Sequence, residues 1–354
     1  MTQQALVVGA TGIVGSALAT QLLDAGWTVH GLARRADALP AGVRGVAADL
    51  TDAQATRAAL AGCAPTHVFI TTWSRQASEA ENIRVNAAMV RHLLDGLQPA
   101  GSVRHVALVT GLKHYLGPFE AYAQGALPQT PFRETQPRLD IENFYYAQED
   151  EVFAAAARDG FHWSVHRPHT VIGAAVGNAM NMGTTLAVYA SLCKATGRPF
   201  RFPGSSAQWD GLTDMTDARQ LAKHLRWAAT TPAAADEAFN IVNGDVFRWR
   251  WMWGRIAAWF DLEPAPFDGT VQPLEMQMAH DADAWMQLAR THGLVESDIH
   301  RLISPWHTDA DLGRPLEVVT DMSKSRRMGF LDYQASDDAF YDLFATLRAQ
   351  RLIP

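Results

Sequence analysis

The architecture of this chain can be deduced from a short segment near its start, Leu6-Val7-Val8-Gly9-Ala10-Thr11-Gly12-Ile13-Val14-Gly15. An apolar run ends at Gly9, and a helical pattern begins at Ile13. In strand-turn-helix units that bind dinucleotides, the first glycine permits a tight turn and the second lets the backbone approach a pyrophosphate, while the third lets helix and strand pack closely. The helix start offers free N–H groups and the positive end of its dipole. The segment therefore predicts a phosphate-binding turn that includes Thr11.

Short apolar runs alternate with helical patterns up to about residue 170. The predicted strands lie at 5–9, 28–33, 45–49, 67–71, 105–110 and 163–167, and the predicted helices at 13–25, 52–61, 81–97 and 143–157. This alternation indicates right-handed crossovers and a mostly parallel sheet with helices on both faces. We therefore predict the α/β class, with a doubly wound parallel sheet of the Rossmann type.

The alternation breaks down in the second half of the chain. Gly, Asn and Met are mixed in the segment 170–210, which contains one helical pattern at 184–195, and a strand-like run follows at 239–242. No low-complexity linker separates the halves. We expect a Rossmann domain at 1–170 and a smaller, mixed substrate-binding portion at 171–354, packed against the carboxyl edge of the sheet.

Composition argues against several classes of protein. The 354 residues are 48% hydrophobic, which is enough for a large core, and the net charge of −7 provides no basic field for a nucleic acid. No apolar run reaches the roughly 18 residues that span a bilayer, and the start does not resemble a signal peptide. We therefore expect a cytoplasmic protein with neither a nucleic acid nor a membrane as partner.

Metal-binding and basic motifs are equally weak. Cys63 and Cys193 are the only cysteines, and the 13 histidines form no HExxH motif, so no metal is predicted. The strip Arg248-Trp249-Arg250-Trp251-Met252-Trp253-Gly254-Arg255 is basic and aromatic. Helical spacing nevertheless places Trp249 and Trp253 on one face, which predicts core packing.

The ends of the predicted strands indicate which cofactor is bound. NAD-dependent enzymes place a carboxylate after the second strand to bind the ribose 2′-hydroxyl, whereas this chain has Arg34 and Arg35, which suit a 2′-phosphate. NADPH is therefore favoured over NADH. Asp49 is expected beside the adenine. The same edge of the sheet contributes Leu50, Thr71 and Thr110.

The candidate catalytic tyrosine and lysine do not follow the spacing that is usual for reductases of this fold. Reductases of this fold commonly pair a tyrosine with a lysine in Tyr-x-x-x-Lys, where the ammonium group lowers the pKa of the phenol. Here the helix runs Asn143-Phe144-Tyr145-Tyr146-Ala147-Gln148-Glu149-Asp150, so acidic residues occupy both lysine positions. Lys113, in the loop after the fifth strand, lies at the edge where such folds bind ligands. The two tyrosines point about 100° apart, so at most one of them faces the cofactor.

At these residues the chain resembles the enone reductases of the progesterone 5β-reductase and iridoid synthase type, which are atypical short-chain dehydrogenases. The resemblance is carried by Gly111-Leu112-Lys113-His114-Tyr115-Leu116-Gly117-Pro118, by the Asn-Phe-Tyr-Tyr helix and by Trp163-Ser164-Val165-His166-Arg167-Pro168. It continues to Gly329-Phe330-Leu331, so it covers nearly the whole chain.

The resemblance implies roles for particular residues. The catalytic lysine of the family matches Lys113 and its catalytic tyrosine matches Tyr145, which leaves Tyr146 for packing. The implied reaction is the NADPH-dependent 1,4-addition of hydride to an enone, with Tyr145 and Lys113 also contacting the cofactor. A small apolar enone is the expected substrate, and a homodimer is compatible with the family. The aromatic and apolar residues expected around the substrate are Trp73, Phe119, Met182, Phe330 and Tyr333.

Two other functions stay open at this point. A carbonyl reductase or epimerase of the extended short-chain class would use the same tyrosine and lysine, but the missing Tyr-x-x-x-Lys argues against it. A non-catalytic NADP-binding regulator would keep the glycine turn and lose the chemistry, which the presence of both Lys113 and Tyr145 argues against.

Overall fold

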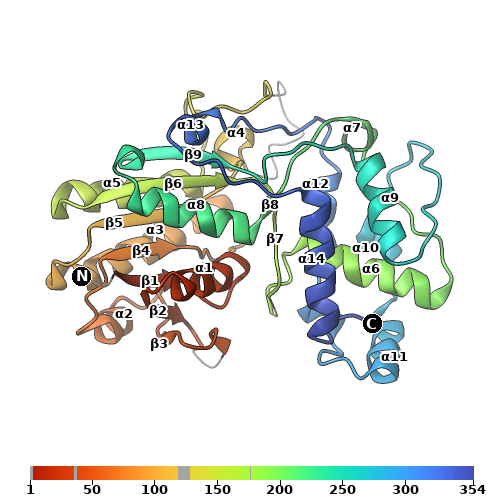
Figure 1. Cartoon of the computed structure of the whole chain (residues 1–354), viewed down its shortest axis with the longest axis horizontal. Coiled ribbons are helices and arrows are strands. Elements are labelled where there is room, and N and C mark those ends of the chain that lie inside the picture. Colours follow the sequence, from red (N-terminus) through yellow and green to blue (C-terminus); the bar gives the residue numbers. More distant parts are fainter. Residues whose placement is uncertain (1–2, 36–37, 119–127, 176) are drawn as a thin grey trace.

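The structure is a computed structural model that describes residues 3–35, 38–118, 128–175 and 177–354. Its centre is a seven-stranded sheet in which every neighbouring pair is parallel (Figure 1). Across the sheet the strands are β3 (Arg44–Ala47), β2 (Thr28–Ala33), β1 (Gln4–Val8), β4 (His67–Ile70), β5 (His105–Val109), β6 (His162–Pro168) and β9 (Glu237–Ile241). This order is that of a doubly wound dinucleotide-binding sheet, so the predicted fold class is confirmed.

The register of the central strands fixes where a ligand can bind. Val8 of β1 pairs with Leu32 of β2 on one side and with Ile70 of β4 on the other. The loops that follow these three strands therefore leave the sheet at one edge. In open α/β sheets, the carboxyl edge beside the point where the strand order reverses is the ligand-binding crevice.

Helices cover both faces of the sheet. On one face α1 (Ile13–Asp24) packs beside α8 (Ala218–Thr230), and their apolar residues share a core with β1. On the other face lie α2 (Ala53–Leu60), α3 (Glu79–Leu97) and α5 (Phe144–Asp159) (Figure 1). Asp52 and Asn143 are N-cap residues, which is why two of the predicted helices began one residue early.

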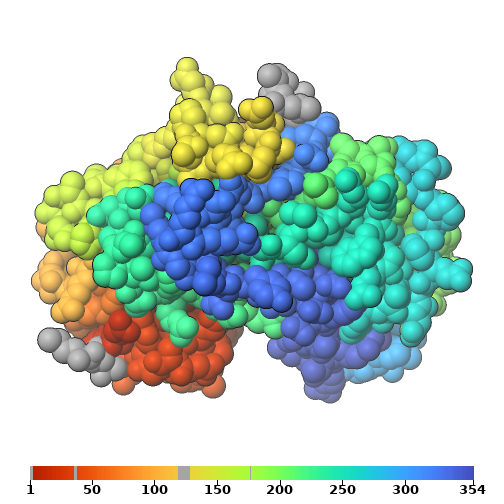
Figure 2. Space-filling view, turned by 45° about the horizontal axis from the view of Figure 1, so that its top comes forward, coloured from red at the N-terminus to blue at the C-terminus, as the bar shows by residue number. Residues whose placement is uncertain are grey.

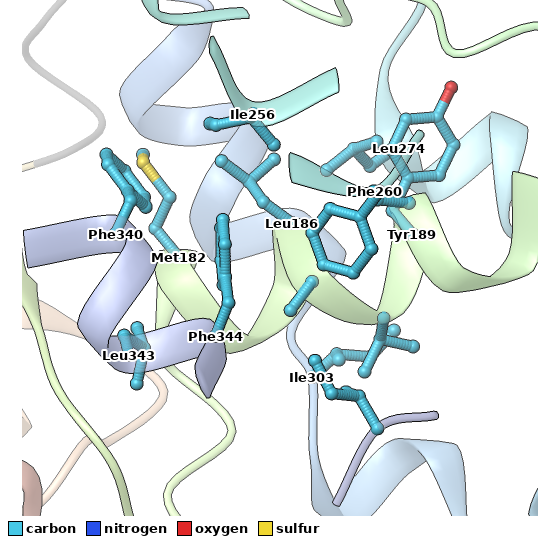
Figure 3. Packing of buried hydrophobic residues seen from close by; sticks show 14 of the residues in the cluster. Met182, Leu186, Tyr189, Ile256, Phe260, Leu274, Ile303, Phe340, Leu343 and Phe344 are labelled. Carbon is cyan, nitrogen blue, oxygen red and sulfur yellow. The ribbon is translucent and has the colours of Figure 1, made fainter. Parts of the chain in front are cut away.

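The C-terminal portion is mainly helical. Its elements are β7 (Val171–Ile172), α6 (Met182–Thr196), α7 (Ser206–Asp210), β8 (Thr216–Asp217), α9 (Trp249–Trp259), α10 (Leu274–Gln277), α11 (Ala282–His292), α12 (Pro305–Leu312), α13 (Ser323–Arg327) and α14 (Ser336–Ala349). Nearly all of α6 is buried, and Figure 3 shows Met182, Leu186 and Tyr189 packed against residues of α9 and α14. An apolar helix surrounded by other helices acts as the core of such a portion.

The basic aromatic strip lies in α9. Trp249 and Trp253 are buried in the same core as Ile256, as the helical spacing predicted. Arg250 and Arg255 point outward and form ion pairs with Asp210 and Asp337. The strip is therefore a packing surface with a paired, charged outer face.

The two portions are interwoven along the chain. After residue 170 the chain returns to the sheet, where it contributes α8 and then β9. In Figure 2 the red N-terminal elements and the blue C-terminal elements are separated by an indentation on one side, and green segments join them. The division at residue 170 stays a prediction, and it does not coincide with the boundary of the sheet.

Candidate active site

A cavity of about 860 Å³ opens at the carboxyl edge of the sheet and is lined by residues of both portions. Among its lining residues are nearly all those expected to bind the cofactor: Gly9, Thr11, Gly12, Ile13, Arg34, Arg35, Asp49, Leu50, Thr71, Thr110, Lys113 and Tyr145. Of the residues expected around the substrate, Trp73 and Tyr145 line it. One cavity therefore contains the glycine turn, the arginine pair and the tyrosine with its lysine.

The glycine turn has the geometry of a phosphate cradle. Gly9 adopts a φ of +84°, and a Cβ atom there would lie 2.7 Å from the Cβ of Thr72. Gly15 lies outside the cavity lining, and a Cβ atom on it would lie 2.2 Å from the Gly9 oxygen, so its role is close packing. Gly12 is the N-cap of α1 and has no side chain to occupy the first N–H groups. The turn thus leaves room and donors for a pyrophosphate.

The loops after β2 and β3 carry the predicted adenosine contacts. Arg34 and Arg35 are exposed at the cavity, where their guanidinium groups can reach a phosphate. Asp49 accepts hydrogen bonds at Oδ1 from the Thr51 amide (2.9 Å) and from the Thr51 hydroxyl (2.7 Å). These bonds lower the pKa of the Asp49 carboxyl, so it stays ionised as an acceptor.

Lys113 is the first residue of α4 (Lys113–Leu116), the short helix after β5. Its side chain is buried, and Nζ lies 4.9 Å from the ring centre of Phe144 and 5.9 Å from that of Trp73. These two rings stack at 5.1 Å. Aromatic faces attract cations, so the pair holds the ammonium group inside the cavity.

Tyr145 approaches the same loop from α5. A Cβ atom on Gly111 would lie 3.3 Å from the Tyr145 hydroxyl oxygen, so the hydroxyl reaches the backbone two residues before Lys113. The ring of Tyr145 packs on Phe144 at 4.4 Å. Tyr146 does not line the cavity, and its hydroxyl donates a hydrogen bond to the His114 carbonyl oxygen. Of the two adjacent tyrosines, Tyr145 therefore faces the cavity, whereas Tyr146 is bonded to α4.

Three residues predicted to contact the substrate do not line the cavity. Met182 is buried in the C-terminal core, and Phe330 is buried against His224 and Trp227 beside α8. Tyr333 is 70% exposed. The segment 330–334 is held away from the cavity, because the Gln220 side-chain amide of α8 donates to the Asp332 oxygen and the Gln334 amide donates to the Asn243 oxygen. A substrate contact by Met182, Phe330 or Tyr333 stays a prediction. Phe119 lies outside the described residues.

Sequence analysis missed a polar wall of the cavity, formed by His169, Thr170, His307, Asp311 and Arg314. His169 Nδ1 donates to Asp214 Oδ1 at 2.8 Å, and His169 Nε2 accepts from Arg314 Nη1 at 2.7 Å, which is the pattern of a neutral imidazole. These residues come from separate elements. Of these residues, only His169 could have been placed near the cavity from the sequence, because it follows the predicted strand 163–167.

The charges of this wall are compensated internally. Arg314 forms an ion pair with Asp311, whose second oxygen accepts from the Thr170 hydroxyl at 2.6 Å. Burial alone would raise the pKa of Asp311, but Arg314 and neighbouring groups hold it below its usual value. Burial, with help from nearby arginines, lowers the pKa of His307. The wall therefore presents an ionised carboxylate and neutral imidazoles to the cavity.

Within the part of the chain that the structure describes, no group of three or more His, Cys, Asp or Glu side chains is arranged to hold a metal ion. Over the same residues, none of the helices combines the length and the apolar character needed to cross a bilayer.

Fold and cavity together define the class, a dinucleotide-binding enzyme with a doubly wound sheet. The model of the NAD dependent epimerase/dehydratase family matches residues 5–242, and the chain belongs to this family. Membership indicates a nicotinamide dinucleotide as the cofactor. The glycine turn and the uncapped start of α1 fit the pyrophosphate of such a molecule.

Curated relatives narrow the class further. The chain is 37% identical to the 3-oxo-Delta(4,5)-steroid 5-beta-reductase of Arabidopsis thaliana, over 99% of this chain and 93% of that protein. It is 35% identical to the (S)-8-oxocitronellyl enol synthase of Camptotheca acuminata, with the same coverage of both proteins. The chain therefore belongs to the family of these enone reductases, and the resemblance predicted from the sequence is confirmed.

Solved structures share the fold at lower identity. The UDP-glucose 4-epimerase of Thermotoga maritima, determined with UDP-glucose, superposes with a TM-score of 0.66 at 14% identity, over 98% of this chain and 99% of that one. An enzyme of Bordetella bronchiseptica determined with NAD⁺ has the same score, identity and coverage. At this identity the similarity supports the fold alone.

Proposed function

We propose that this chain catalyses the NADPH-dependent reduction of the C=C bond of α,β-unsaturated carbonyl compounds, by 1,4-addition of hydride to enones. The observation that carries the proposal is that Tyr145 and a lysine displaced from the Tyr-x-x-x-Lys position line the same cavity as the glycine turn. Relatives named as a steroid 5-beta-reductase and as enol synthases support it.

The preference for NADPH rests on the loop after β2. Arg34 and Arg35 line the cavity there and suit a 2′-phosphate, whereas NAD-dependent enzymes have a carboxylate at this place. Asp49, held ionised by Thr51, would accept from the exocyclic amine of the adenine. Gly9 and Gly12 would leave room for the pyrophosphate.

The chemistry of this chain follows from where charge develops. The bound cofactor would supply a hydride to the β-carbon of the enone, and a proton from water would then complete the reduction at the α-carbon. As the hydride is added, negative charge grows on the carbonyl oxygen, and the Tyr145 hydroxyl donates a hydrogen bond to it. Lys113, whose ammonium group lies against the faces of Phe144 and Trp73, would place a positive charge near that hydroxyl. In a site that excludes water, a hydrogen-bond donor stabilises a developing negative charge far more than it does in water.

The direct test follows NADPH oxidation with 2-cyclohexen-1-one and identifies the product by gas chromatography. The wild type is expected to form cyclohexanone. Tyr145→Phe and Lys113→Met are each expected to lower kcat by roughly 10² to 10³-fold, as is typical when a donor to a developing oxyanion is lost. Tyr189→Phe, which removes a buried hydroxyl in the C-terminal core, is the matched control.

Other products or rates would contradict the proposal. Formation of 2-cyclohexen-1-ol would assign carbonyl reduction, because hydride would have reached the carbonyl carbon. Binding of NADPH without turnover of this or larger enones would assign a non-catalytic regulator. The expected apolar substrate, the homodimer and the cytoplasmic location belong to the same proposal, and gel filtration tests the dimer.

A further inference from the structure

Lys113, the catalytic lysine of the proposed function, lies in a very short helix. Lys113 begins a helix of four residues, α4, between Gly111 and Gly117. A helix of this length does not hold itself in water, since isolated helices need about 12 to 15 residues even to be marginal. The position of the lysine must therefore come from contacts outside α4.

The proline that follows α4 leaves one of its carbonyl groups without the usual helical partner. In an α-helix the His114 oxygen would accept from the amide of residue 118, but residue 118 is proline and has no N–H. The preceding Lys113 oxygen does accept from the Gly117 amide, at 3.0 Å. A buried carbonyl without a donor costs about 1 to 3 kcal/mol, so His114 needs a donor from another element.

Tyr146 is that donor. Its hydroxyl donates to the His114 oxygen at 2.8 Å and accepts from the Leu139 amide at 3.0 Å. On the other side of Tyr145, the Asn143 side-chain amide donates to the Lys113 oxygen, also at 2.8 Å. The N-cap residue of α5, Asn143, and the third residue of the helix, Tyr146, thus hold the backbone of Lys113 and of its neighbour.

The ring of Tyr146 is itself held by a buried charge network. The Arg138 guanidinium lies 4.8 Å from its ring centre and donates to Glu149 at 2.7 Å. Glu149 is almost fully buried and lies 3.7 Å from Arg167. Glu149 occupies the position of the lysine in Tyr-x-x-x-Lys. Its carboxylate holds Arg138 against the ring of Tyr146, and Tyr146 in turn is bonded to α4.

We propose that Tyr146 is a positioning residue, whose hydroxyl holds α4 so that the ammonium group of Lys113 lies beside Tyr145. This inference rests on the proposed function, because it assigns Tyr146 a role only through Lys113. Burial raises the pKa of Tyr146, so the hydroxyl stays protonated and remains a donor at neutral pH. The sequence alone indicated packing for this residue, and the hydrogen bond adds a second role.

The test is Tyr146→Phe, which removes the hydroxyl and keeps the ring. The expected result is a kcat lowered by about 10-fold, with KM for NADPH and for 2-cyclohexen-1-one unchanged within about twofold, since small displacements of catalytic groups act on the reaction step. Tyr189→Phe is the matched control. The Tyr189 hydroxyl is also both donor and acceptor: Gln277 Oε1 at 2.6 Å and the Arg201 oxygen at 3.2 Å lie within its donor reach, and it accepts from the Arg201 amide at 3.1 Å.

A double-mutant cycle with Lys113→Met separates positioning from a general loss of structure. If Tyr146 acts through Lys113, Tyr146→Phe lowers the residual rate of the Lys113→Met enzyme by less than about twofold, because coupled residues are not additive. The same 10-fold loss in both backgrounds would overturn the inference. If the Lys113→Met enzyme forms no measurable product, the test rests on Tyr146→Phe alone. A lowered kcat with unchanged KM values supports the inference, and an unchanged kcat overturns it.

The outcomes distinguish this inference from the proposed function. If Tyr145→Phe and Lys113→Met retain the wild-type rate, the proposed function fails. If those two variants lose activity while Tyr146→Phe keeps it, only the positioning role fails. An equal loss of kcat in Tyr146→Phe and Tyr189→Phe would assign both hydroxyls to stability alone and would also overturn the inference.

Discussion

Arg34 and Arg35 are the residues on which the proposed preference for NADPH over NADH rests. A guanidinium group binds a phosphate with two charge-assisted hydrogen bonds, whereas the 2′-hydroxyl of NADH offers it no charge. The double variant Arg34→Ala/Arg35→Ala is expected to raise KM for NADPH by about 10 to 100-fold, as a hydrogen bond to a charged group is worth about 1.5 to 3 kcal/mol. KM for NADH is expected to stay within about threefold.

The control for this variant is Arg44→Ala. Arg44 is an exposed arginine at the start of β3 and does not line the cavity. An equal rise in KM for both cofactors in Arg34→Ala/Arg35→Ala would show that the arginines contact a part shared by NADPH and NADH. From the sequence alone, the position of these residues after the second strand predicts a phosphate contact. The structure has both residues at the cavity, and the contact itself stays a prediction.

At the scale of elements, β5, β6 and α8 share a row of buried histidines. His105 Nε2 and His166 Nε2 each lie 2.9 Å from the Ser164 hydroxyl, and His166 Nδ1 lies 2.8 Å from His224 Nδ1. One of two ring nitrogens at this distance must be unprotonated, and burial lowers the pKa of both His166 and His224, so both rings are neutral near pH 7. Burial, reinforced by neighbouring charges, lowers the pKa of His105 to about 3, and burial lowers that of His224 to about 3.

This row predicts how stability depends on pH. An unfolded histidine takes up a proton below about pH 6.5, whereas the folded rings do so only near pH 3, so their contribution is complete above pH 6.5 and is lost as the pH falls. Inside that window, each histidine is expected to lower the free energy of unfolding by about 1.4 kcal/mol for every pH unit by which the pH falls. Urea unfolding at about pH 7.5 and pH 5 measures the slope.

The variant for this prediction is His224→Leu, since its ring lies among Trp227, Phe239 and Phe330. The free energy of unfolding is expected to fall less steeply between the two pH values than in the wild type. His292→Gln, which changes an exposed histidine of α11, is expected to keep the wild-type slope. A wild-type slope in His224→Leu as well would refute the assignment of the pH dependence to this row.

Across the whole molecule, sequence reasoning succeeded where the information is local. The alternation of strands and helices predicted the sheet, because each crossover is encoded within one segment. Phe330 and Tyr333, which were expected at the substrate but do not line the cavity, lie in a loop whose path depends on its packing against α8. The polar wall escaped prediction because His169 and Arg314 are 145 residues apart, and no periodic pattern records such a contact.

Arg314 also connects the C-terminal portion to the edge of the sheet. It pairs with Asp311 and donates to His169, and all three side chains are buried. Removing one partner of a buried ion pair leaves the other charge unpaired, which typically costs about 3 to 5 kcal/mol. Arg314→Ala is therefore expected to lose about that much unfolding free energy in urea, whereas Arg301→Ala, whose side chain is 55% exposed in its pair with Glu296, is expected to lose less than about 1 kcal/mol. Equal losses in the two variants would mean that solvent reaches the Arg314 pair, and the wall would then not act as a buried connection between the two portions.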